Sequence, residues 1–128
     1  MTDPAAAPAP LRVLLVDPDD RVRESLAGLL RIGQKCLVIG TAGTADGAVL
    51  LAAETAPDCV VVDPRLPGID GSALIARLRA VAPDTRVLVL NWSETADLTS
   101  GAYAYARKTF RPHELIDAVV ATTRRSVA

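Results

Sequence analysis

Apolar residues along this chain fall into two alternating patterns. Short, nearly continuous apolar runs are typical of buried parallel strands, and between them apolar residues recur every three or four positions, as on one face of a helix. The strand-like runs are Leu11–Val16, Cys36–Gly40, Cys59–Val62, Val87–Leu90 and Ala102–Ala106. Helices are predicted over Asp19–Arg31, Thr44–Thr55, Ser72–Val81 and from Pro112 onward, and Ser93–Ser100 has room for about two helical turns.

Capping and breaking residues support these helix limits. Asp19 or Asp20 is suited to cap the first helix, Gly33 to close it, and Thr44 to cap the second. Pro112 is suited to the first turn of the last helix. The apolar positions expected on the helices are Val22, Leu26, Leu29, Leu30, Val49, Leu50, Ala53, Leu74, Ile75, Leu78, Leu115, Ile116, Val119 and Val120.

Strands that alternate with helices through short links favour one α/β domain. Each crossover between parallel strands is right-handed, so the helices cover both faces of a single doubly wound, five-stranded parallel sheet. A chain of 128 residues is long enough for one such domain with its own core. We expect residues 1–10, rich in alanine and proline, to form a flexible tail, and residues 11–128 to form the domain.

The charge, the hydropathy and the cysteines of the sequence limit the kinds of partner and environment that we expect for this chain. The formal net charge is −1 and no basic stripe is present, which argues against direct nucleic-acid binding. No apolar stretch approaches the roughly 20 residues of a membrane span. Cys36 and Cys59 lie in apolar runs and are expected to be buried, reduced thiols, which suits a cytoplasmic protein.

The candidate chemistry lies where the strands end. Asp17, Asp63 and Lys108 follow the first, third and fifth apolar runs, and the carboxyl ends of parallel strands meet at one edge of the sheet. Carboxylates suit a hard divalent cation, and an aspartate can accept a phosphoryl group while a lysine pairs with its oxygens. This arrangement predicts a phosphoryl-transfer site with Asp63 as nucleophile and Asp17 near the metal.

These residues lie in segments that resemble the receiver domain of bacterial two-component response regulators. The likeness covers about Leu11 to Val120. It rests on Val16-Asp17 opening into Arg21-Val22-Arg23, on the stretch Asp63-Pro64-Arg65-Leu66-Pro67-Gly68-Ile69-Asp70-Gly71 after an apolar strand, and on Lys108-Thr109-Phe110. The resemblance implies a flavodoxin-like, receiver-type fold with strand order 2-1-3-4-5. It also implies a phosphoprotein in a phosphorelay, with a sensor histidine kinase or another signalling protein as partner.

The resemblance also assigns roles to single residues. Asp63 would be the phosphoacceptor, Asp17 would belong to the acidic pocket that binds Mg²⁺, and Lys108 would sense the phosphoryl group. Asn91 would stand in the catalytic position at the end of strand four, and Tyr105 would be the aromatic switch on strand five.

Several positions depart from the family's pattern. Pro18 replaces the second acid, which normally contacts the metal, so Mg²⁺ binding should be weak or absent unless Asp19 substitutes. Asn91 replaces a threonine or serine, Trp92 replaces a small residue and could cover the site as part of the switch, and Thr109 replaces a proline. The chain between strands four and five is short, so the fourth of the family's five helices should be short or irregular. The resemblance therefore predicts an atypical receiver.

Alternatives remain open. A degenerate receiver could act as a phosphorylation-independent protein-interaction module, and Arg65 could neutralise Asp63 or Asp17 in place of a metal. A remote alternative is a haloacid dehalogenase-like phosphohydrolase with Asp17 as nucleophile and Asp19 as general acid. That class needs an acidic pair after Lys108, where only Glu114 and Asp117 follow.

We therefore expect a protein that is not an enzyme. A homodimer, if formed, should use the first helix or the outer side of the last one. His113, one residue into that last helix, is expected to be an exposed helix residue rather than a metal ligand.

Overall fold

The fold is a single parallel sheet between two pairs of helices. A computed structural model describes residues 9–91, 104–108 and 111–124. The strands follow the order β2-β1-β3-β4-β5, and all neighbouring pairs are parallel. Their bounds are β1 Leu11–Val16, β2 Cys36–Ala42, β3 Cys59–Val62, β4 Arg86–Asn91 and β5 Ala104–Arg107. The predicted doubly wound sheet and its order are confirmed.

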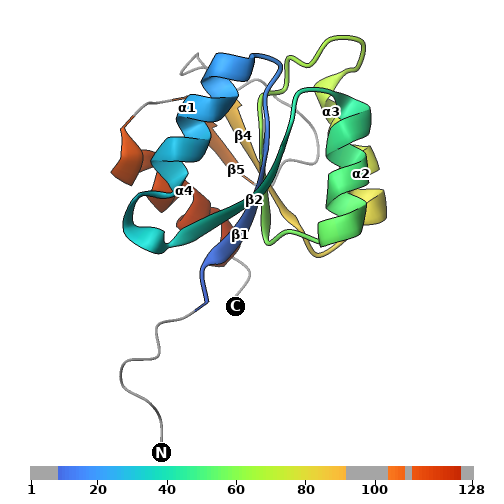
Figure 1. Cartoon of the computed structure of the whole chain (residues 1–128). Helices are drawn as coiled ribbons and strands as arrows, with labels where there is room; N and C mark the ends of the chain where they lie inside the picture. Colours follow the sequence, from blue (N-terminus) through green and yellow to red (C-terminus); the bar gives the residue numbers. More distant parts are fainter. Residues whose placement is uncertain (1–8, 92–103, 109–110, 125–128) are drawn as a thin grey trace, which may run out of the picture.

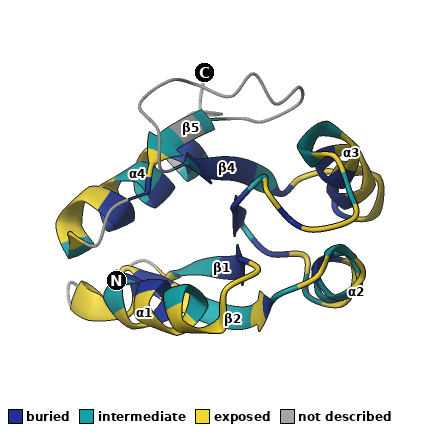
Figure 2. Ribbon diagram, turned by 90° about the horizontal axis from the view of Figure 1, so that it is seen from above, coloured by how far each residue is buried: buried dark blue, intermediate teal, exposed yellow. Residues whose placement is uncertain are grey.

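Helices cover both faces of this sheet. Their bounds are α1 Asp20–Leu30, the short 3₁₀ helix η1 Ile32–Gln34, α2 Ala45–Thr55, α3 Gly71–Val81 and the last helix, α4 Pro112–Arg124. Helices α1 and α4 lie on one side of the sheet, and α2 and α3 lie on the other (Figures 1 and 2). No described helix is both long and apolar enough to cross a membrane.

The buried core divides into one cluster on each face of the sheet. One cluster joins β1, β3 and β4 to α2 and α3, and the other joins the opposite faces of the same strands to α1 and α4. Strands β3 and β4 are buried along almost their whole length, which is what their continuous apolar sequences predict. Cys36 and Cys59 are buried free thiols, and burial raises the pKa of Cys59 to about 12.

Most helix ends follow the predicted caps. Asp19 caps α1 by accepting hydrogen bonds from two backbone N–H groups, and Thr44 caps α2 in the same manner with one. Gly33 has a φ of 79°, the left-handed conformation that glycine adopts without strain, where the chain leaves α1. Asp70, which the sequence interpretation had not assigned, caps α3.

The structure corrects three details. Strand β2 runs to Ala42 rather than Gly40, because its pairing with β1 continues to the end of both strands. Strand β5 runs to Arg107, one residue beyond the predicted Ala106, and the predicted start at Ala102 lies outside the described residues. Helix α2 buries Ala48 and Ala52, whereas the side chain of Leu50 is 59% exposed. The prediction of a short or irregular helix at Ser93–Ser100 lies outside the described residues.

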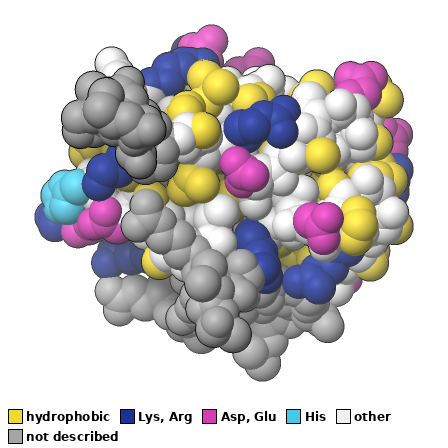
Figure 3. Space-filling model, turned by 90° about the horizontal axis from the view of Figure 1, so that it is seen from below, with side chains coloured by type: hydrophobic (Ala, Val, Ile, Leu, Met, Phe, Trp, Pro, Cys, Tyr) yellow, Lys and Arg dark blue, Asp and Glu magenta, His cyan; other side chains and the backbone are white. Residues whose placement is uncertain are grey.

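Charged side chains of both signs are interspersed on the surface. On the face that carries the amino-terminal ends of the strands, lysine, arginine and acidic side chains alternate among apolar patches (Figure 3). This mixture agrees with the near-zero net charge of the sequence.

Candidate functional site

Two strand ends at the carboxyl edge of the sheet carry the same local turn. After β1, the backbone N–H of Asp19 donates to Asp17 Oδ1 at 2.9 Å, and after β3 the N–H of Arg65 donates to Asp63 Oδ1 at 2.9 Å. In each turn an aspartate side chain accepts from the residue two positions on, with a proline between them. The two Asp-Pro-X turns therefore hold one oxygen of each carboxylate by the backbone and leave Oδ2 of each for other partners.

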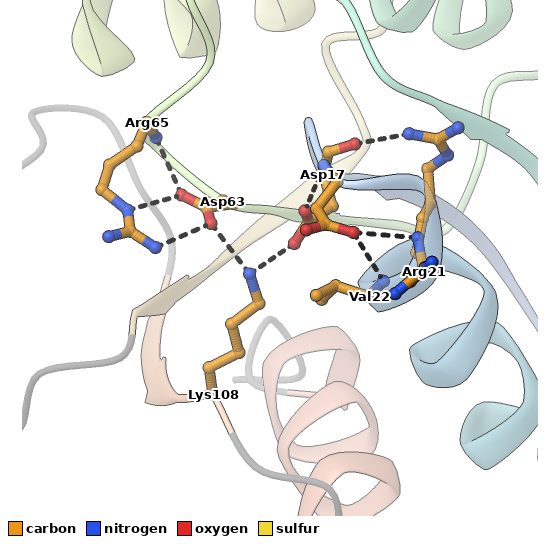
Figure 4. A network of polar contacts seen from close by, with 8 residues as sticks. Asp17, Arg21, Val22, Asp63, Arg65 and Lys108 are labelled. Carbon is orange, nitrogen blue, oxygen red and sulfur yellow. Dashed lines mark hydrogen bonds and ion pairs between the residues drawn. The ribbon is translucent and has the colours of Figure 1, made fainter.

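Lys108 joins the two carboxylates. It follows β5, and its Nζ lies 2.8 Å from Asp63 Oδ2 and forms an ion pair with Asp17 Oδ2 (Figure 4). All three side chains are at most 3% exposed. Asp17 Oδ2 accepts no hydrogen bond from the described residues, so among them the ion pair with Lys108 is what balances its buried negative charge. The structure thus brings together Asp17, Asp63 and Lys108, as the sequence predicted.

A second cation contacts Asp63 from the solvent side. Arg65 places Nε 3.3 Å from Asp63 Oδ1 and Nη2 3.3 Å from Asp63 Oδ2, and its side chain is 56% exposed (Figure 4). Burial by itself raises the pKa of Asp63, but the bonds from the Arg65 side chain, from Lys108 and from the Arg65 backbone outweigh it and leave this pKa below its usual value. Asp63 is therefore held as a carboxylate.

The supply of metal ligands near this site is small. Pro18 offers no side-chain oxygen, and the Asp19 carboxylate accepts hydrogen bonds from the N–H groups of Arg21 and Val22 as the cap of α1. Among the described residues no group of three histidine, cysteine, aspartate or glutamate side chains is placed to hold a metal ion. Asp19 thus acts as the cap of α1, and the carboxylates of Asp17 and Asp63 remain as candidate metal ligands.

Other predicted residues lie nearby or outside the described set. Asn91 ends β4, is partly buried, and accepts a hydrogen bond from the Lys108 N–H through its backbone oxygen. Trp92 and the side chain of Tyr105 lie outside the described residues. His113 is exposed on α4, as expected.

Arg23 is a member of the site that the sequence interpretation missed. Its Nη1 donates to the backbone oxygen of Asp17 at 2.8 Å, its Nη2 forms an ion pair with Asp20, and its side chain is 18% exposed. A Cβ at Gly43, after β2, would lie 2.6 Å from Arg23 Nη1. Arg23 therefore connects the β1–α1 turn to α1 by a hydrogen bond, and its guanidinium packs against Gly43 in the β2–α2 loop. Arg23 lies in the segment Arg21-Val22-Arg23, which carries part of the family resemblance, but the sequence interpretation gave it no role.

We expect Gly43→Ala to destabilise the fold by about 1 kcal/mol, because the new methyl group displaces the Arg23 guanidinium from Asp17 and removes a hydrogen bond. Gly28→Ala is the matched control. Gly28 is exposed in α1 and a Cβ there meets nothing within 4 Å, so this change should stabilise the fold by about 0.5–1 kcal/mol. Urea unfolding measures both, and changes of equal sign would contradict the proposed packing of Arg23.

Comparisons with known proteins agree with this geometry. The sequence profile of the family described as the response regulator receiver domain matches residues 13–120. The chain is 34% identical over 122 residues to the response regulator MprA of Mycobacterium sp. (strain KMS), covering 91% of this chain and 52% of MprA. It is 37% identical over 119 residues to the transcriptional regulatory protein PrrA of Mycobacterium leprae, covering 89% and 50%. The chain thus spans about half the length of these curated relatives.

Solved structures show the same relationship. A two-component response regulator of the LuxR family from Aurantimonas sp. SI85-9A1 has a TM-score of 0.80 and 30% identity, covering 89% of this chain and 85% of that one. The response regulator domain of Thermotoga maritima CheB has a TM-score of 0.79 and 26% identity, covering 89% and 96%.

Proposed function

Because this chain belongs to the response-regulator receiver family of two-component systems, we propose that it is an atypical receiver whose partner binding depends little on phosphorylation. Asp63 is its candidate phosphoacceptor, Lys108 contacts it, Asn91 at the end of β4 is the third candidate site residue, and the metal site is impaired. Family membership disfavours the phosphohydrolase alternative, and Asp19, which that alternative needs as a general acid, caps α1 instead.

The charge balance around Asp63 carries this proposal. Two carboxylates, Asp17 and Asp63, face two cations, Lys108 and Arg65, so the cluster is formally neutral. Receiver domains typically bind Mg²⁺ at the phosphorylation site, and a hard cation gains most from several fixed, negatively charged oxygens. Here a divalent ion would add two uncompensated charges to a neutral cluster and would compete with Lys108 for Asp17 Oδ2. The donor set therefore does not fit a tight magnesium site.

The same contacts bear on the conformational response. In a switch, phosphorylation must change the relative stability of two states through contacts made in only one of them. Lys108 is already buried between both carboxylates, and Asn91 offers an amide where the family has a hydroxyl. Modification of Asp63 should therefore create few contacts that the unmodified domain lacks.

We expect partner binding by the Asp63→Ala variant to stay within about threefold of the wild type, since the surface that the partner contacts should change little. The expected partner is a sensor histidine kinase or another signalling protein, and a homodimer stays a prediction. The direct test of the switch is beryllofluoride with Mg²⁺, read by amide NMR. Large shifts that reach Tyr105 and α4, accompanied by loss of partner binding in Asp63→Ala, would show an ordinary switch and contradict the proposal.

We further expect Mg²⁺ to bind without saturating at low-millimolar concentration. The titration can follow Trp92 fluorescence and the amide resonances of Asp17 and Asp63. Asp63→Asn serves as the control for a signal that comes from the site. Saturation at low-millimolar Mg²⁺ or below that disappears in Asp63→Asn would contradict the weak-site assignment.

The proposed function also includes the partners, the location and the domain limits of this chain. Relatives about twice as long carry names such as transcriptional regulatory protein, but we propose no direct nucleic-acid binding by this chain, because its charges are balanced and interspersed. Receiver domains are generally not enzymes, and we propose that this chain is not an enzyme either. We also propose a cytoplasmic location, a flexible tail over residues 1–10 and a receiver domain over residues 11–128.

A further inference from the structure

We infer that Arg65 takes over the charge-neutralising part of a divalent cation, so that an acyl phosphate can modify Asp63 without metal. This inference rests on the proposed function, because it concerns the same site. It assigns to the cluster of Arg65, Lys108 and Asp63 a metal-free binding site for a phosphoryl group.

Two cations lie around the candidate acceptor, Asp63. Arg65 Nε and Nη2 each lie 3.3 Å from a different oxygen of Asp63, and Lys108 Nζ lies 2.8 Å from Asp63 Oδ2. The two side chains reach the Asp63 carboxylate from different sides (Figure 4), and Arg65 is 56% exposed whereas Lys108 is 2% exposed. A phosphoryl group arriving at Asp63 from solvent therefore meets a cation on each side.

Arg65 is fixed at its backbone and exposed at its guanidinium end. Its backbone N–H is fixed to Asp63 Oδ1 by the Asp-Pro-X turn, so the start of the side chain is anchored two residues from the acceptor. The guanidinium end is 56% exposed, and its 3.3 Å contacts are longer than the 2.9 Å contact of the backbone. A planar guanidinium binds phosphate oxygens with the same fork that it offers to a carboxylate. Rotation of the outer side chain can move that fork from the carboxylate to an incoming phosphoryl group.

The net charge of the cluster changes little during phosphoryl transfer to Asp63. A carboxylate oxygen of Asp63 forms a bond to phosphorus, the bond from phosphorus to the acyl oxygen breaks, and the carboxylate of the donor leaves with the electron pair. The product phosphoryl group carries two negative charges and the Asp63 carboxylate has lost its own. With Asp17, Arg65 and Lys108 beside it, the cluster then has one excess negative charge. This is a small excess, which the two cations can hold without a metal ion.

The test is labelling of the whole chain with acetyl phosphate, followed by intact mass spectrometry, in EDTA and in Mg²⁺. We expect the labelling rate to be equal within about twofold in the two conditions. In EDTA, Arg65→Gln should lower the rate by about tenfold, less than the loss typical of an enclosed transition-state donor, because the guanidinium is half exposed. Arg65→Lys should keep part of the rate, since it keeps the charge but loses the fork.

Three controls make the result specific. Asp63→Asn should abolish the label, and Arg79→Gln removes one exposed positive charge on α3 and should have no effect. Circular dichroism checks that each variant is folded. Labelling that requires Mg²⁺, no labelling in either condition, or equal rates in Arg65→Gln and Arg79→Gln would each overturn the inference. The proposed function is tested separately by partner binding of Asp63→Ala, which does not depend on any labelling.

Discussion

Lys108→Met is expected to lower the free energy of unfolding by about 3 kcal/mol at neutral pH, because it removes the ammonium that joins two buried carboxylates. Methionine keeps most of the side-chain volume, so the loss comes from charge rather than from a cavity. Asp63 would retain Arg65, but the described residues provide no other cation for Asp17 Oδ2. Urea unfolding at neutral pH measures the change.

The pH dependence of this effect has a definite sign. A carboxyl group whose pKa is lower in the folded chain than in the unfolded chain stabilises the fold above the unfolded value, and that contribution is lost as the pH falls through the folded value. Asp63 is such a group. The wild type should therefore lose stability as the pH falls below about 4. The difference between wild type and Lys108→Met should shrink over the same range, because protonation of Asp63 removes a charge that Lys108 pairs with in the wild type.

Two comparisons separate this account from a general effect of losing a lysine. Lys35→Met removes an exposed lysine and should change stability by less than about 0.5 kcal/mol. Combining Lys108→Met with Asp63→Asn should recover part of the loss, since one of the two buried charges is then gone. A Lys108→Met variant as stable as Lys35→Met, or a loss that grows at acid pH, would contradict a buried charge network.

The site's acidic and basic members could be predicted because their positions follow from topology. Asp17, Asp63 and Lys108 end strands β1, β3 and β5, and parallel strands bring such ends to one edge regardless of side-chain detail. The side-chain contacts at that edge follow from three-dimensional packing instead. Arg23 reaches Asp17 and Gly43, and no periodicity in the sequence links these three positions.

The limits of the strands and helices could likewise be predicted only in part from the sequence. Apolar runs identified β1 and β3 with their observed limits, since β3 is apolar and buried throughout and β1 has a single polar residue, Arg12, near its start. Strand β2 lies at the sheet edge, with a mixture of exposed and buried residues, and its last two residues were missed. In α2 the central positions, from Ala48 to Ala53, are all apolar, so the pattern there could not indicate which face is buried, and Leu50 faces solvent.

Arg65 illustrates how far a sequence hypothesis can go. The sequence suggested that Arg65 neutralises either Asp63 or Asp17. In the structure its guanidinium contacts Asp63. The choice depends on the Asp-Pro-X turn, which directs the residue after the proline back toward its own aspartate. The roles of Trp92 and Tyr105 in the switch stay predictions.

Leu88→Ala is expected to destabilise the fold by about 3 kcal/mol, because Leu88 is fully buried in β4 and alanine leaves a cavity that the neighbouring strands cannot close. Its neighbours in register are Val61 on β3 and Ala104 on β5, and its side chain belongs to the cluster beneath α1 and α4. Leu50→Ala makes the same chemical change at the exposed position on α2. It should cost less than about 0.5 kcal/mol, since little apolar surface is buried there and alanine is the better helix former. Urea unfolding of both variants measures the difference, and losses of similar size would mean that α2 presents Leu50 to the core, as the sequence pattern alone had allowed.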